Sequence, residues 1–106
     1  MSRIAPATVS PIEFEGLRYA QIINGSREGL DQRTGFLSIT DIATGRRIAV
    51  VKVYPVTFDP RLEADVQDVF FRRMTLDEAD RRLMVENERS VRVHVAIDGH
   101  AVTPTP

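Results

Sequence analysis

Two histidines and an acid near the C-terminal end are the first residues whose types and spacing could support chemistry. His94 and His100 lie six residues apart, with Asp98 between them. Imidazole and carboxylate groups are common zinc ligands, so the three residues could form a metal site. His100, however, follows Gly99 outside the predicted strands, and metal sites hold their ligands on rigid elements. We therefore predict two solvated histidines and no metal site.

The polar segment 24–35 is the second candidate, because it contains three glycines and no apolar periodicity. Long loops of small domains often carry function. Asp31 and Arg33 in this loop, together with His94, are therefore our candidate ligand-binding residues. The loop lacks the Gly-Lys-Ser/Thr ending of a phosphate-binding loop, and no serine lies in a nucleophile motif. With no cysteine either, the sequence predicts no catalytic residue and no cofactor.

Arginine doublets at 46–47, 72–73 and 81–82 are the third candidate. Together they could bind nucleic acid through its phosphates. Adjacent residues of a strand point to opposite faces, however, so each doublet is expected to place only one arginine on a face. The formal net charge of the chain is also −1. Nucleic-acid binding is therefore kept as an alternative only.

The elements that must position these residues begin with a β-hairpin. Segments 36–41 and 46–54 are rich in β-branched and aromatic residues, as strands are. Between them Asp41 can accept hydrogen bonds from turn amides, and Gly45 can adopt the positive φ that a tight turn needs. Large residues at alternate positions predict a further strand within 12–24.

The remaining elements leave two interpretations open. Asp59 and Pro60 are typical of a helix start and predict a short helix near 60–66. Segments 82–87 and 90–97 predict strands, whereas a capping-box pattern at 75–78 leaves a helix over 76–87 as the alternative. The expected fold is mainly β: an antiparallel meander of five or six strands, curled or barrel-like. The alternative is an α+β fold with the second helix.

The hairpin also resembles one blade of a quinoprotein-type β-propeller. That repeat combines a glycine, an alternating strand, Asp-x-x-Thr-Gly and a second strand. Residues 35–48 match it at Gly35, Leu37, Asp41, Ala43, Thr44 and Gly45. The resemblance implies a hairpin but no quinone cofactor or activity, since a propeller needs several blades and this segment occurs once. As a whole, the chain resembles the short single-domain proteins common in bacterial genomes.

Length and composition complete the sequence-based interpretation. The chain has 106 residues, of which 42% are hydrophobic and 27% charged, as in an ordinary globular domain. We expect one β-rich domain over 12–98, with disordered segments at 1–11 and 99–106. No apolar run approaches the roughly 20 residues of a membrane helix, so we expect a cytoplasmic protein without a membrane partner.

The expected function is a non-catalytic binding or protein-interaction module. A short meander leaves sheet edges open, and the strand 48–54 is apolar on both faces. Self-association through an edge or a face, as a homodimer, would cover such a strand. A small ligand-binding protein or enzyme using the loop 24–35 remains the alternative.

Overall fold

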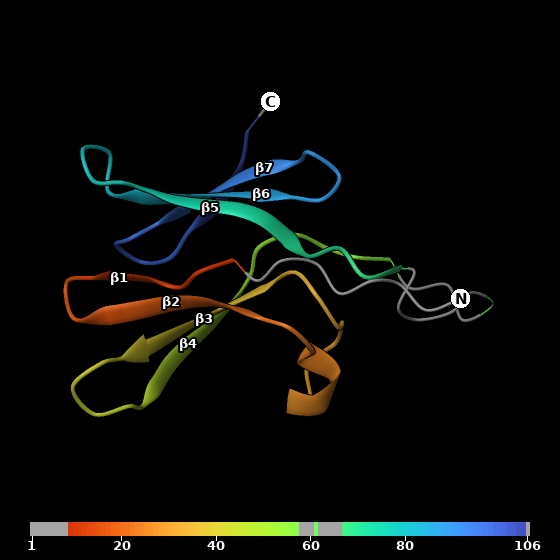
Figure 1. The fold of residues 1–106 in the computed structure, drawn as a ribbon, viewed down its shortest axis with the longest axis horizontal. Coiled ribbons are helices and arrows are strands. Elements are labelled where there is room, and N and C mark those ends of the chain that lie inside the picture. Colours follow the sequence, from red (N-terminus) through yellow and green to blue (C-terminus); the bar gives the residue numbers. More distant parts are fainter. Residues whose placement is uncertain (1–8, 58–60, 62–66, 106) are drawn as a thin grey trace.

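The protein consists of two four-stranded antiparallel sheets, which lie one above the other in Figure 1. The computed structural model describes residues 9–57, 61 and 67–105. The first sheet contains β1 (Ile12–Phe14), β2 (Leu17–Ile22), β3 (Phe36–Asp41) and β4 (Arg47–Lys52) in chain order. The second contains β5 (Phe71–Asp77), β6 (Arg82–Asn87), β7 (Arg92–Ala96) and β8 (Val102–Pro104), also in chain order. A single 3-10 turn, η1 (Gly25–Glu28), follows β2.

The buried face of the first sheet is formed by residues that lie in register across its strands. Tyr19 of β2, Ile39 of β3 and Ala49 of β4 lie opposite one another in register. Tyr19 and Ile39 are fully buried, because their side chains point toward the second sheet. Near the start of β4 the register shifts, because Ile39 pairs with Ala49 and Thr40 pairs with Arg47. Ile48 is therefore the extra residue of a β-bulge.

The core lies between the two sheets. Its members from the second sheet include Leu83, Val85 and Val95, each at most 1% exposed. Burying an aliphatic or aromatic side chain of this size contributes about 1.5–3 kcal/mol. At one side Tyr54 meets the ring of Phe71, with the centroids 6.0 Å apart. Burial raises the pKa of Tyr54, whose hydroxyl donates to a main-chain carbonyl of the segment before β5.

The structure confirms a mainly β fold and the hairpin formed by β3 and β4. It corrects the number of strands and their arrangement, since eight strands form two packed sheets and no closed barrel among the described residues. The alternative helix over 76–87 is wrong, because this range contains the end of β5, a turn and β6. Most of the helix predicted near 60–66 lies outside the described residues.

One further expectation differs from the structure, and two local features add to the description. The tail 99–106, expected to be disordered, contributes β8 to the second sheet. Gly16 and Glu15 form the turn between β1 and β2, where both residues have positive φ. Val91, which precedes β7, is 44% exposed. No helix in the described part of the chain is long and apolar enough to cross a membrane.

Candidate functional site

The loop between β2 and β3 is built around η1. Asn24 caps this turn, because its Oδ1 accepts a hydrogen bond from the Ser26 amide at 3.1 Å. Gly29 ends it in the left-handed conformation. Gly25 packs so closely that a Cβ there would lie 3.0 Å from the ring of Phe36. The glycines therefore allow the loop to fold back on the outer face of the first sheet.

Gln32 fixes the second half of the loop. Its Nε2 donates to the carbonyl oxygens of Thr34 at 2.6 Å and of Tyr54 at 2.8 Å. Its Oε1 accepts from the amide of Val56 at 3.2 Å. Thr34, which is fully buried, accepts a hydrogen bond from the Val69 amide through Oγ1 at 3.1 Å. These two polar side chains thus join the loop to the chain after β4 and to the segment before β5.

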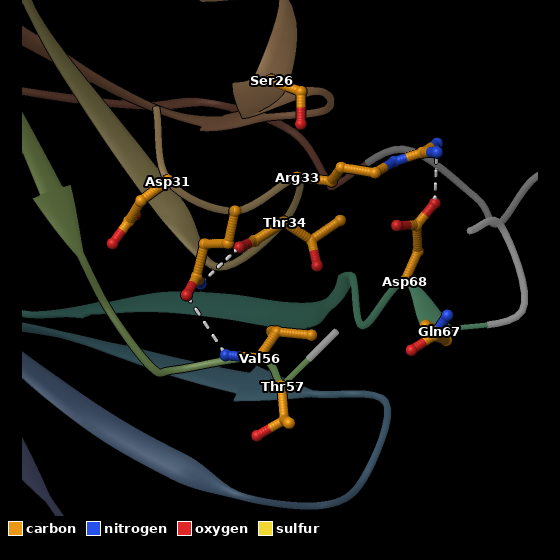
Figure 2. Close-up of a pocket in the computed structure, with 9 residues that line it drawn as sticks. Ser26, Asp31, Arg33, Thr34, Val56, Thr57, Gln67 and Asp68 are labelled. Atoms are coloured by element: carbon orange, nitrogen blue, oxygen red, sulfur yellow. Dashed lines mark hydrogen bonds and ion pairs between the residues drawn. The ribbon is translucent and has the colours of Figure 1, made fainter. Parts of the chain in front are cut away.

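A depression of about 240 Å³ opens beside this loop. Figure 2 shows its lining, in which Asp31 and Arg33 extend in opposite directions from the loop. Arg33 reaches Asp68, with 3.1 Å between Nη2 and Oδ2, and only 7% of the Asp68 side chain is exposed. The remaining lining residues are Ser26, Gln32, Thr34, Val56, Thr57 and Gln67.

The charged groups of this depression already have partners. Asp31 lies 2.6 Å from the Lys52 ammonium, and this hydrogen bond holds the pKa of the Asp31 carboxyl below its ordinary value. Arg33 is paired with Asp68, but its Nε is buried and has no acceptor among the described residues. The arrangement can hold a ligand that supplies a hydrogen-bond acceptor to Arg33.

The structure brings together only two of the three predicted ligand-binding residues. His94 lies on β7 of the second sheet, between Met84 and Thr103 in register. It lines a separate depression that includes Arg82. Asp98, the acid between the two histidines, is 2.8 Å from the Nε of Arg81. The described residues include no group of three histidines and acids placed to hold a metal ion.

Sequence reasoning missed Gln32, Gln67 and Asp68. The role of Gln32 depends on hydrogen bonds with Tyr54 and Val56, which lie 22 and 24 residues further along the chain. No local sequence pattern indicates such contacts. Gln67 and Asp68 stand in an acid-rich segment that also fits a solvated surface. Their burial, at 9% and 8% exposure, follows from tertiary packing.

The open edge of β4 is a second surface of interest. β4 pairs with β3 on one side, and no described residue pairs with its other side. Ile48 and Val50 point away from the core and are 50% and 38% exposed. The two cations of this strand each have an acidic partner in the loop: Arg47 contacts Glu28, and Lys52 contacts Asp31. The edge therefore presents apolar side chains between neutralised charges.

No family model matches this sequence, and comparisons with curated proteins and with solved structures find no significant match. A function must therefore be inferred from the contacts, burial and charges of the chain itself. The loop depression and the open edge of β4 are the two surfaces that bear on the functions expected from the sequence.

Proposed function

We propose that this protein is a non-catalytic interaction module that self-associates through the open edge of β4. The supporting observation is the exposure of Ile48 and Val50 beside an edge to which no described residue is paired. Proteins usually protect such edges with charges, bulges or a covering segment. Here the bulge at Ile48 affects only one end, and the charges at both ends are neutralised within the chain.

The backbone of β4 is oriented for pairing with another strand. The Val53 amide donates to the Gly35 carbonyl at 2.7 Å, so these two residues form a hydrogen-bonded pair. Hydrogen-bonded and non-hydrogen-bonded pairs alternate along antiparallel strands. The amides and carbonyls of Val50 and Lys52 therefore point away from β3, toward the open edge. A strand that pairs there would extend the first sheet.

A second copy of this chain is the occupant that fits best. Antiparallel pairing centred on Val50 places Val50 of one copy opposite Val50 of the other, and Ile48 opposite the aliphatic part of Lys52. Apolar cross-strand pairs contribute about 0.2–1 kcal/mol each. The ion pairs of Arg47 with Glu28 and of Lys52 with Asp31 remove the repulsion between cations that two basic strand ends would otherwise create.

Sedimentation equilibrium at micromolar concentration tests the proposal. We expect a species of twice the 11.9 kDa monomer mass. Val50→Lys should convert it to monomer, because a lysine opposite its own copy places two cations together. Val91→Lys is the matched control, since Val91 has similar exposure but lies before β7 on the other sheet. A clean monomer for the unmodified chain, or equal effects of both substitutions, would exclude this function.

A small-ligand-binding protein is the second candidate function. The observation that favours it is the buried Nε of Arg33, which has no acceptor among the described residues. A carboxylate entering the loop depression would pair with the accessible part of the Arg33 side chain, which is 34% exposed. Acetate titrated into labelled protein should then shift the Arg33 Nε–H resonance saturably and leave that of Arg18, which is paired with Glu13, unchanged. A linear or equal shift of both resonances contradicts a ligand site at the loop.

A further inference from the structure

A row of charged side chains crosses the outer face of the second sheet. Arg73 of β5, Glu86 of β6 and Arg92 of β7 lie opposite one another in register. The register of β5 shifts between Phe71 and Arg73, which leaves Arg72 as the extra residue of a β-bulge. Arg72 reaches the same face, since its Nε and Nη2 lie 2.9 and 2.5 Å from the same oxygen of Glu86. The bulge thus brings both arginines of one doublet together, where strict alternation would separate them.

Glu86 holds two of these arginines in place. One carboxylate oxygen accepts from Arg72, and the other accepts from the Nε of Arg92 at 2.9 Å. Only 6% of the Glu86 side chain is exposed, whereas 48% of Arg72 and 56% of Arg92 are exposed. The Nη atoms of Arg92 and the Nη1 of Arg72 form no hydrogen bond with the described residues. The buried carboxylate of Glu86 therefore holds each arginine in position, and N–H donors remain on the solvent-exposed side of each guanidinium group.

Positive charge is in excess at this place. Five other arginines of the described chain each form an ion pair with a carboxylate other than that of Glu86: Arg18 with Glu13, Arg33 with Asp68, Arg47 with Glu28, Arg81 with Glu15 and Asp98, and Arg82 with Asp77 and Asp80. Arg72 and Arg92 share Glu86, and Arg73 forms no ion pair with any described residue. The three arginines and the single glutamate of this row carry a formal charge of +2.

The arginines border a groove. A depression of about 410 Å³ is lined by Arg72, Glu86, Ser90, Val91, Arg92 and Thr105. Its volume falls within the range of about 300–1,000 Å³ that is typical of small-ligand sites. The Ser90 hydroxyl accepts from Arg72 at 3.0 Å, so its own hydrogen can be donated to a ligand.

We propose that this groove, which we call the arginine groove, binds the phosphate group of a small phosphate monoester. The dianion matches the local charge of +2, and guanidinium groups bind phosphate oxygens through paired N–H donors. The positive charge does not continue along the sheet, because Arg82 is paired with Asp77 and Asp80. None of the described residues that line the groove is aromatic, so none can stack a base. A compact phosphate therefore fits better than a nucleic-acid strand.

Methyl phosphate titrated into ¹⁵N-labelled protein tests this site. We expect saturable shifts of the Arg72 and Arg92 Nε–H resonances. Arg73→Gln should weaken binding severalfold, because it removes one positive charge from the row of side chains beside the groove. The fold should survive, since Arg73 makes no ion pair within the described structure. Arg18→Gln is the matched control: it removes an exposed arginine from the first sheet and should leave the affinity unchanged.

Three results would overturn the proposal. One is a linear response, or a shift of the Arg18 resonance as large as those of the groove. Another is an unchanged affinity in Arg73→Gln protein whose amide spectrum shows an intact fold. The third is a single-stranded oligonucleotide that binds this face a hundredfold more tightly than methyl phosphate, which would assign the face to nucleic acid. Each readout is independent of self-association through β4.

Discussion

Alanine substitutions at Gly35 and Gly45 distinguish two costs, backbone strain and steric contact. Gly35 ends the loop of the candidate ligand site, and Gly45 lies in the turn between β3 and β4. Gly35 and Gly45 have φ values of +92° and +71°, in the region that L-residues avoid. A Cβ at Gly45 would meet nothing within 4 Å. A Cβ at Gly35 would lie 2.6 Å from the Nε2 of Gln32 and 2.7 Å from the carbonyl oxygen of Tyr54. Both substitutions strain the backbone, but only Gly35→Ala displaces a neighbour.

The expected costs follow from these contacts. Gly45→Ala should reduce the free energy of unfolding by about 1 kcal/mol, the approximate cost of a left-handed L-residue. Gly35→Ala carries the same cost and also displaces Gln32, whose Nε2 bonds the carbonyls of Thr34 and Tyr54. Each hydrogen bond contributes about 0.5–1.5 kcal/mol. We therefore expect a total loss of about 2–4 kcal/mol, a large fraction of the roughly 5–15 kcal/mol that stabilises a domain.

Urea denaturation followed by circular dichroism measures both costs. Equal losses for Gly35→Ala and Gly45→Ala would refute the contact that we assign to Gly35. A double-mutant cycle adds a second check: in Gln32→Ala protein the clash with Nε2 is absent, so Gly35→Ala should cost less than in the unmodified chain. Strict additivity of the two substitutions would show that Gln32 is not the residue displaced.

Two further predictions concern the core and the arginine groove. Tyr54→Phe should reduce the free energy of unfolding by about 1 kcal/mol, because the Tyr54 hydroxyl donates to the buried Val69 carbonyl. Tyr19→Phe should cost nothing, because the Tyr19 hydroxyl has no partner in the described structure. Equal urea midpoints for the two variants would contradict this. Hydrogen bonds from Arg92 and Arg72 hold the pKa of the Glu86 carboxyl below its ordinary value. The ionised Glu86 therefore stabilises the fold above about pH 4.3, and this stabilisation is lost as the pH falls through the lowered pKa. A carboxyl-carbon NMR titration should show this pKa rise in Arg92→Gln protein, and an unchanged titration would contradict it.

The hairpin of β3 and β4 could be predicted from sequence because its signals are local. Both strands are rich in β-branched and aromatic residues, and Gly45 supplies the positive φ of the turn. The second sheet was harder, because 75–78 combines a capping-box pattern with residues that also suit a strand. Pairing with β6 decides the outcome: Thr75 lies opposite Met84, and Leu76 lies opposite Leu83 in the core. Tertiary contacts thus override a local helix signal.

The bulge in β5 explains why the arginine groove was not predicted. The expectation of one arginine per face assumed a regular strand, whereas the extra residue places Arg72 beside Arg73. A signal was present in the spacing of the inward residues: Phe71 and Met74 are three apart, and Leu76 follows two later. An interval of three within a strand indicates an inserted residue. The shared carboxylate of Glu86, by contrast, could not be located without the register of β6.

The candidate loop site was predicted in part. Asp31 and Arg33 do line one depression, because η1 and Gln32 fold the loop against the chain after β4. His94 was included for its chemistry alone, and the chain turns it to the outer face of the other sheet. Which charges in a loop remain available depends on partners far along the chain, such as Lys52 for Asp31.

The two proposed surfaces lie on different sheets, so they can be tested separately. Val50 lies on the outer face and open edge of the first sheet, and Arg73 lies on the outer face of the second. The buried core between the sheets separates them, and no ion pair among the described residues joins one surface to the other. Val50→Lys should therefore change the mass of the assembly without changing phosphate affinity, and Arg73→Gln should do the reverse. If either substitution alters both measurements, the surfaces are coupled, and self-association would itself have to contribute to the phosphate site.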